Sequence, residues 1–273
     1  MLTLLAGKSA RAFFVGLISL TGLISLILIF IGTVSIPKVY ASGMLGIEFK
    51  GGAYFQNISG HLKIGNSING YGPTNITPSD IGLQTAKTEP MFKVAFLMLY
   101  DNRISFTYVP YVYNGSRVLS KKIYFNGKTY DVNTDVTSQL DIYSYKMFYT
   151  RNFDISNYVS IGLGVGVDLI TVKTELNSLY ATESKDVNLP IPLMGVRLKI
   201  SPLNDFSFIG RFQGFALGSK GYYYHVNVGV DYKAIGPLSV FADYVYDKVH
   251  VDTNNVDGSL EFEGPEAGLR LRF

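Results

Sequence analysis

The stretch Ala267-Gly268-Leu269-Arg270-Leu271-Arg272-Phe273 ends the chain and places an apolar side chain at every second position. Side chains alternate between the two faces of a strand, so the four apolar residues share one face and the two arginines share the other. This pattern, closed by a terminal aromatic, is typical of the last strand of an outer-membrane β-barrel. A soluble antiparallel sheet also alternates, but it has no need of a C-terminal Phe. We therefore predict that Ala267, Leu269, Leu271 and Phe273 face lipid and form the signal for barrel assembly.

The other end of the chain has the features of an export signal. Residues 1–41 contain three basic residues, no acidic residue and an apolar run from Phe13 to Val34. Val39-Tyr40-Ala41 then offers small residues at the spacing that a signal peptidase reads. The run is also long enough to span a bilayer, so an uncleaved anchor is the alternative. We expect cleavage after Ala41 and a single β-barrel domain over residues 42–273.

The charge of the chain changes once this leader is set aside. The leader holds three of the 24 basic residues, so 21 basic and 21 acidic residues remain. A neutral chain gives no reason to expect nucleic acid or another polyanion as a partner. The chain has no cysteine, which excludes disulfides, thiolate metal sites and cysteine nucleophiles.

The remaining sequence reads as ten alternating segments separated by turn residues, which predicts an all-β, up-and-down antiparallel transmembrane barrel. An even strand count places both termini on one side of the membrane. Eight strands with two surface hairpins is the alternative. The ten predicted strands are Leu45–Ile64, Glu89–Tyr100, Arg103–Tyr113, Ser138–Tyr149, Val159–Glu175, Leu189–Ile200, Phe206–Leu217, Tyr222–Tyr232, Leu238–His250 and Ser259–Phe273.

The lengths of the connections alternate between short and long. Tight turns would lie on the periplasmic side, and residues 65–88, 114–137 and 176–188 would form external loops. Phe125-Asn126-Gly127 is a hairpin signal inside the second of these loops. With no tryptophan in the chain, we expect the 20 tyrosines to form the aromatic girdle at the membrane interfaces.

Two blocks of sequence resemble a known family. Gly51-Gly52-Ala53-Tyr54-Phe55-Gln56 with Ile58-Ser59-Gly60, and Phe262-Glu263-Gly264-Pro265-Glu266-Ala267-Gly268-Leu269, resemble a largely uncharacterised family of bacterial outer-membrane β-barrels named for a Gly-Gly pair in the first strand. Phe55 stands where members often have Trp. The resemblance implies a fold and an outer-membrane location, and it implies no activity, cofactor or substrate. Similarity to barrels that pass small hydrophobic molecules is an analogy of size and architecture.

The inward face of the predicted strands carries eight basic and six acidic residues. Balanced charges in a narrow barrel favour ion pairs that fill the interior, and a weakly anion-preferring pore is the alternative. The inward charged residues, assigned by alternation, are Glu48, Lys50, Lys93, Lys146, Asp168, Arg197, Lys199, Arg211, Asp231, Asp243, Asp247, Glu266, Arg270 and Arg272.

Catalytic and metal sites have weaker support. His250 lies between Asp247 and Asp252, which would suit a general base at the barrel rim, but no nucleophilic serine motif is nearby. Asp247, Asp252 and Asp257 match no calcium-loop spacing. We therefore expect no enzyme, cofactor or metal.

Two classes of function remain. The barrel is either a passage or binding protein for small solutes, including small hydrophobic molecules, or a structural protein that presents its loops to other molecules. Its expected partners are outer-membrane lipid, lipopolysaccharide and the barrel-assembly machinery, and the sequence does not predict an oligomeric state.

Overall fold

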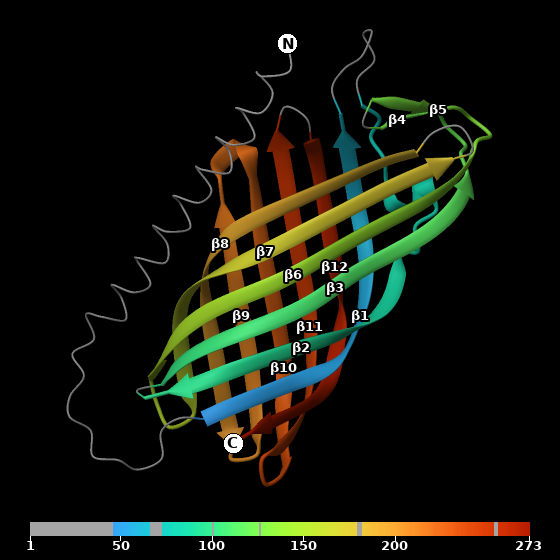
Figure 1. Cartoon of the computed structure of the whole chain (residues 1–273). Helices are drawn as coiled ribbons and strands as arrows, with labels where there is room; N and C mark the ends of the chain where they lie inside the picture. Colours follow the sequence, from blue (N-terminus) through green and yellow to red (C-terminus); the bar gives the residue numbers. More distant parts are fainter. Residues whose placement is uncertain (1–45, 66–72, 100, 126, 179–181, 254–255) are drawn as a thin grey trace. The chain divides into compact units, whose positions relative to one another are not determined.

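The alternating segments form ten long strands that close into one antiparallel barrel in the computed structural model (Figure 1). Each strand pairs with its neighbour in the sequence, and the first strand closes the barrel by pairing with the last, from Glu48 opposite Arg272 to Ile64 opposite Val256. The structure describes residues 46–65, 73–99, 101–125, 127–178, 182–253 and 256–273. The predicted signal peptide lies outside these residues.

The barrel strands run over 11 to 22 residues, longer than a membrane crossing of about 10 residues requires. They are β1 (Gly46–Ile64), β2 (Ala86–Met98), β3 (Asn102–Val118), β6 (Asp135–Asp154), β7 (Val159–Ser178), β8 (Thr182–Leu203), β9 (Phe206–Ala216), β10 (Gly221–Ile235), β11 (Leu238–Thr253) and β12 (Val256–Arg272). A separate hairpin, β4 (Ile123–Phe125) and β5 (Lys128–Tyr130), and two 3₁₀ helices, η1 (Pro78–Ile81) and η2 (Gly218–Lys220), complete the elements.

The count of ten strands is confirmed, and the eight-strand alternative is wrong. The predicted loop over residues 176–188 is also wrong, because β7 continues to Ser178 and β8 begins at Thr182. Residues 182–188 are polar except for Val187, so they lack the apolar alternation that marks a lipid-facing segment, yet they pair with β7 throughout. The alternation of apolar and polar residues therefore identified the lipid-facing parts of β7 and β8, and it missed the polar parts of these strands that continue beyond them.

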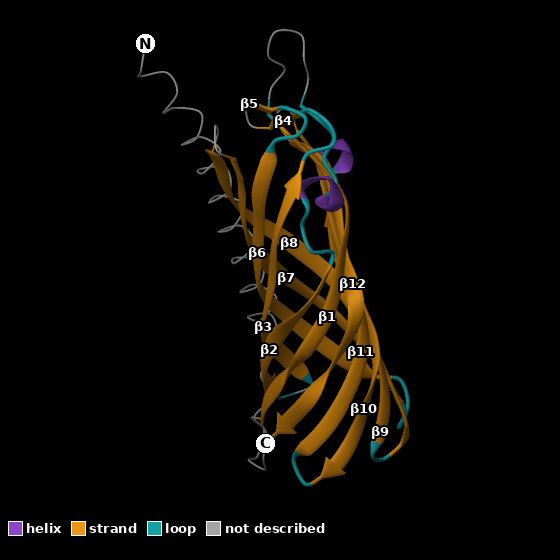
Figure 2. Ribbon diagram, turned by 90° about the vertical axis from the view of Figure 1, so that its right-hand side faces the viewer, coloured by secondary structure: helices purple, strands orange, loops and turns teal. Residues whose placement is uncertain are grey.

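The two ends of the barrel differ in their connections (Figure 2). At one end, the turn end, consecutive strands join through a few residues, as at 204–205 and 236–237. At the other, the loop end, residues 65–85 and 119–134 form long connections. The second contains the predicted hairpin, with Phe125 opposite Lys128. Within the described residues, no helix has the length and apolarity needed to cross a membrane.

The outer wall of the barrel is apolar. Exposed side chains include Leu163 and Leu169 on β7, Phe208 and Phe212 on β9, and Leu269 on β12. Such a surface is unfavourable in water and is expected of a wall that contacts lipid.

The tyrosines only partly form the predicted girdle. Tyr224 stands on the outer wall, with its ring 6.4 Å from Phe212 and 5.8 Å from Tyr246 between centroids. The expectation that the tyrosines as a set form the girdle is wrong, because six others are buried. These are Tyr54, Tyr111, Tyr113, Tyr130, Tyr149 and Tyr223. Tyr223 lies between two girdle tyrosines in the sequence, and strand alternation turns it inward.

Candidate functional site in the barrel lumen

The lumen has two halves of different chemistry. Buried charged side chains fill the half toward the turn end, and apolar side chains line the half toward the loop end. A layer of tyrosine, histidine and carboxylate side chains separates them. The predicted inward residues make up most of the charged half, and the apolar half was not predicted.

Lys50 is the centre of the first ion-paired layer. Its Nζ lies 2.6 Å from Asp243 Oδ2 and 2.6 Å from Glu266 Oε1, and all three side chains are buried. The ammonium group also lies 3.8 Å from the centre of the Phe241 ring, within cation–π range. Both carboxylates are thus compensated by one cation.

The paired glycines of the barrel closure make room for this layer. Gly52 of β1 faces Gly268 of β12. A Cβ on Gly52 would lie 2.2 Å from the Ala267 carbonyl oxygen and 2.9 Å from the Phe241 ring. The inward Gly of the Gly-Gly pair therefore allows β12 and the Phe241 ring to approach β1 closely.

A second layer lies nearer the turn end. Glu48 accepts two hydrogen bonds from the Arg103 guanidinium, at 3.1 and 2.7 Å, and Arg270 Nε lies 3.3 Å from the same carboxylate. Arg270 also pairs with Asp231. Arg272 lies directly opposite Glu48 in the ladder with β12, but of these two arginines only Arg270 lies within ion-pair distance of Glu48. Arg103 was missed because it begins its strand, although alternation places it on the same face as Ser105.

Several inward cations have no carboxylate within 4 Å in the described part of the chain. Arg197 donates to Asn152 Oδ1 at 3.2 Å, and Arg211 donates to Asn227 Oδ1 at 2.8 Å. The charged half of the lumen therefore carries an excess of positive charge. The cations concerned are Lys93, Arg197, Lys199 and Arg211; Arg272, which was also assigned to the lumen, is exposed at the end of β12.

Asp247 organises the layer between the two halves. It accepts hydrogen bonds from Tyr111 at 3.0 Å and Tyr223 at 2.9 Å, and its Oδ1 lies 2.8 Å from His225 Nδ1. Lys146 Nζ lies 3.1 Å from the Tyr223 hydroxyl and 3.8 Å from the fully buried Asp168. The layer therefore consists of polar groups that mostly bind one another.

Above this layer lies a cavity of about 250 Å³ inside the barrel. Its walls are almost entirely aliphatic and aromatic, and Asp247 and Tyr223 form its floor. The principal wall residues are Leu62, Ile142, Ile170, Val172, Leu189, Ile191, Val249, Val251, Leu260 and Phe262. They come from β1, β6, β7, β8, β11 and β12, so the cavity is enclosed by most of the barrel.

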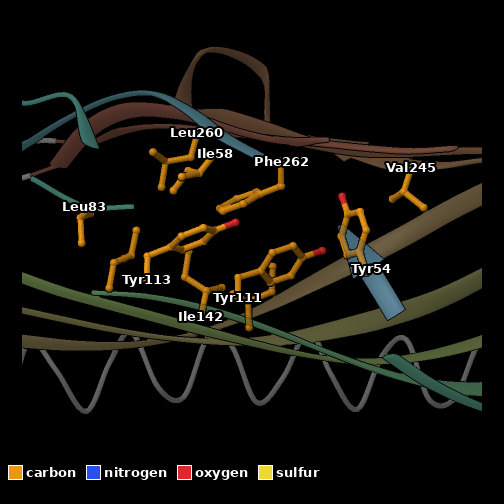
Figure 3. Packing of buried hydrophobic residues seen from close by; sticks show 11 residues of the cluster. Tyr54, Ile58, Leu83, Tyr111, Tyr113, Ile142, Val245, Leu260 and Phe262 are labelled. Atoms are coloured by element: carbon orange, nitrogen blue, oxygen red, sulfur yellow. The ribbon is translucent and has the colours of Figure 1, made fainter. Parts of the chain in front are cut away.

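A packed cluster of rings and aliphatic side chains adjoins the cavity, and Tyr111, Leu260 and Phe262 belong to both (Figure 3). Tyr111 and Tyr113 of β3 point toward Phe262 of β12, with ring centroids 4.5 and 6.3 Å from it. Gln56 accepts from the Tyr113 hydroxyl at 2.8 Å. The hydroxyl groups are thereby satisfied and the ring faces remain for apolar contact.

The long connections cover part of the loop end. Leu119, Ile123, Phe125 and Tyr130 pack with Ile64, Ile76, Val136 and Leu176 in a second apolar cluster. Beside it, Asp80 of η1 lies 2.7 Å from Lys121 Nζ and accepts from the Thr77 N–H at 2.8 Å. Partial burial raises the pKa of Asp80, but these hydrogen bonds outweigh it and hold that pKa below its usual range.

The alternatives that placed chemistry at the rim do not fit the geometry. His250 pairs with Tyr222 on the outer wall, with ring centroids 5.2 Å apart, whereas Asp247 points into the lumen. His225, and not His250, is the histidine that contacts Asp247. Among the described residues no group of three or more His, Cys, Asp or Glu could hold a metal ion, and Asp257 instead pairs with Lys63 at 2.6 Å.

The last strand lies as the terminal alternation predicts. Ala267, Leu269, Leu271 and Phe273 are exposed on the outer wall, and Arg270 is buried in the lumen. The role of the four apolar residues as an assembly signal stays a prediction.

Comparison with known proteins agrees with the fold. No family model matches the chain, and no curated protein matches it; the resemblance to the Gly-Gly family therefore stays a prediction. The structure is similar to the outer membrane protease OmpT from Escherichia coli, with 11% identity, 86% of this chain and 99% of that chain covered, and a TM-score of 0.55. The outer membrane protein AlkL gives 13% identity, coverage of 88% and 96%, and a TM-score of 0.39. The chain has the fold of an outer-membrane β-barrel.

Proposed function

We propose that this chain is an outer-membrane barrel that binds a small apolar molecule in the loop half of its lumen and does not form an open aqueous pore. The loop end would face outward, and the outer wall would contact lipid and lipopolysaccharide. The proposal needs no cofactor, metal or catalytic step. Delivery by a cleaved leader and insertion by the barrel-assembly machinery belong to it as expectations.

The apolar cavity is the observation that carries this proposal. An apolar cavity of about 150 Å³ in a protein core stays dry and binds benzene. The cavity here, at about 250 Å³, is larger, and its walls offer aliphatic and aromatic contacts with few polar atoms. Such a volume suits a short hydrocarbon chain or a small ring system better than a hydrated ion.

The charged half of the lumen supports the second part of the proposal. Lys50, Asp243 and Glu266 form one compensated layer, and Glu48, Arg103 and Arg270 form another below it. Ion pairs that bridge several strands hold side chains across a narrow barrel. They favour a closed floor beneath the cavity.

The test is to soak crystals of the protein in 1-bromooctane and to locate the bromine by its anomalous scattering. We expect bromine density among Ile142, Ile170 and Phe262. Ile170→Trp should abolish this density because the larger side chain fills the cavity. Ile161→Trp is the matched control, since Ile161 lies on the same strand and faces outward.

Two results would contradict the proposal. Bromine found only on the outer wall would mean that the cavity does not take an apolar ligand. Equal bromine density in the cavity of both tryptophan variants would mean that the site is not the one described.

A further inference from the structure

The ladder between β8 and β9 ends long before β8 does. The pairing runs from Leu203 opposite Phe206 to Met194 opposite Gly214, and β9 ends two residues later at Ala216. β8 continues to Thr182 and pairs with β7 over that whole length. Among the described residues, the β9 side of β8 over 182–193 therefore has no strand partner, and the barrel wall is split there.

Two prolines mark this free edge in the sequence. Pro190 and Pro192 lie opposite Leu169 and Val167 in the intact ladder with β7. Proline has no N–H to donate, so within a sheet it is confined to positions whose N–H would face away from the partner strand. Prolines two residues apart point the same way, so both missing donors lie on the β9 side. The edge of β8 that lacks a partner strand therefore has two fewer N–H groups that need a hydrogen-bond acceptor.

A second split, between β2 and β3, is closed by other groups. Its ladder ends at Phe92 opposite Tyr108, and continuing that register would set Pro90 opposite Pro110. Here Gln56 Nε2 donates to the Pro110 carbonyl at 2.9 Å and Lys87 Nζ donates to the Val112 carbonyl at 2.6 Å. Leu83 pairs with Gly115 beyond the gap. The β8 split has no such bridge among the described residues.

The β8 split adjoins the apolar cavity. Leu189 and Ile191, on the free part of β8, line the cavity from one side, and Tyr223 and Val249 line it from the other side of the split. Leu193, the last inward residue before the ladder closes, packs against Tyr223 and Phe148. The cavity therefore lies directly behind the split, on the inner side of the barrel wall.

The split also begins at the height of the aromatic girdle. Met194, Gly214 and Tyr224 lie in one row of the sheet, and Tyr224 stacks with Tyr222 at 5.9 Å between centroids. Interfacial tyrosines mark the level of the lipid headgroups. Met194 and Leu217 flank the start of the split with 61% and 64% of their surfaces exposed. An apolar molecule dissolved in the membrane would meet apolar side chains at this point.

We propose that the split between β8 and β9 is the port through which an aliphatic chain moves between the outer leaflet and the cavity. This inference rests on the proposed function and adds the route by which the ligand enters the cavity and the membrane as its source. The ligand reaches its site from the membrane, either as a free apolar molecule or as the acyl chain of a lipid. The ligand then does not have to pass through the aqueous loop end of the barrel to enter or leave the cavity.

The experiment closes the port with a disulfide in the full chain. Because the chain has no tryptophan, Phe262→Trp places a single reporter in the cavity wall. The protein in lipid vesicles is mixed with vesicles that contain 1-bromooctane, and quenching of the tryptophan is followed in time. Pro192→Cys with Ala216→Cys lies two pairs beyond Met194 and Gly214 in a continued ladder register. We expect oxidation of this pair to slow quenching about tenfold or more without changing its final extent, and reduction to restore the rate.

The matched control bridges the same two strands where they already pair. Val196→Cys with Phe212→Cys lies two pairs below Met194 and Gly214, on the ladder side of the split. Its oxidation should leave the quenching rate unchanged. Ile191→Phe gives a second, bridge-free test, because a larger ring on the inner side of the split should also slow quenching.

The outcomes separate this inference from the proposed function. Quenching of equal rate and extent in open, bridged and Ile191→Phe proteins would overturn the port and leave the cavity site intact. Absence of quenching in every variant would overturn the cavity itself. Replacing bromooctane with a lipid brominated on its acyl chain distinguishes the two sources, since quenching then requires an acyl chain to enter.

Discussion

Lys50 faces the lumen, as its place in the alternation of β1 predicts, but its partners do not come from its own row. The residues opposite Lys50 on β12 and β2 are Arg270 and Lys93, both cations. The strands are inclined, so the Lys50 side chain instead reaches Glu266 on β12 and Asp243 on β11. The face of a charged residue could be predicted from the sequence, whereas its ion partner required the geometry of the closed sheet.

Removal of the Lys50 ammonium group leaves two buried carboxylates without their cation. We expect Lys50→Met to lower the free energy of unfolding by about 3 to 5 kcal/mol, as found when one member of a buried pair is removed. Denaturation by urea, with the heat-dependent shift in gel mobility as readout, measures this loss.

Lys63 supplies the control for this substitution. Its ion pair with Asp257 has the same 2.6 Å length, but more than a third of each side chain is exposed. Lys63→Met should therefore cost less than about 1 kcal/mol, the usual range for exposed pairs. Equal losses for the two variants would show that burial does not govern the contribution of the Lys50 layer.

At the scale of one strand, β7 shows how small residues shape the lumen. Gly164 and Gly166 leave space that the ring of Phe148 on β6 occupies, because a Cβ on either glycine would lie 2.4 or 2.5 Å from that ring. The glycine face of this strand suits a narrow lumen, and Phe148 of the neighbouring strand is buried against it. The identity of the side chain that fills the space could not be predicted, since it lies on another strand.

We expect Gly166→Ala to destabilise the barrel by about 1 to 3 kcal/mol through overpacking. The added methyl group would lie against the Phe148 ring and 2.3 Å from the Met147 carbonyl oxygen. Gly210→Ala on β9 is the matched control, because no atom lies within 4 Å of the position of its Cβ. Urea denaturation of both variants provides the comparison. A loss of stability in Gly210→Ala as large as in Gly166→Ala would mean that the intrinsic properties of glycine, and not crowding, explain the effect.

The apolar half of the lumen escaped prediction for a reason that lies in the strands. An inward apolar residue such as Ile170 or Leu189 looks the same in the sequence as a lipid-facing one, because alternation assigns the charged face to the lumen. Toward the loop end the pattern on β7 reverses: Ile170, Val172 and Leu176 lie on the inward face, and the outward positions between them are polar. This exchange of the apolar and polar faces, together with Pro190 and Pro192, was the signal in the sequence for the cavity and its free edge.

Over the whole molecule, the two halves of the lumen imply different permeabilities. The loop half has room for an apolar molecule, whereas Phe148, Phe241 and the ion pairs fill the turn half. A hydrated ion would have to displace these side chains and separate buried charges. The barrel is therefore expected to resist ion flow even though it contains an internal cavity.

Planar-bilayer recording tests this expectation. We expect the wild-type protein to show no steady openings of nanosiemens size, because the buried layers block the turn half. Phe148→Ala combined with Phe241→Ala removes two buried rings from this half and should produce measurable ion flow. The outward-facing pair Phe208→Ala and Phe212→Ala loses the same side-chain volume on the outer wall and should remain closed. Steady openings in the wild type would contradict the closed floor. They would favour instead an anion-preferring pore, since the cations without a carboxylate partner, such as Lys93 and Arg211, would then line the path.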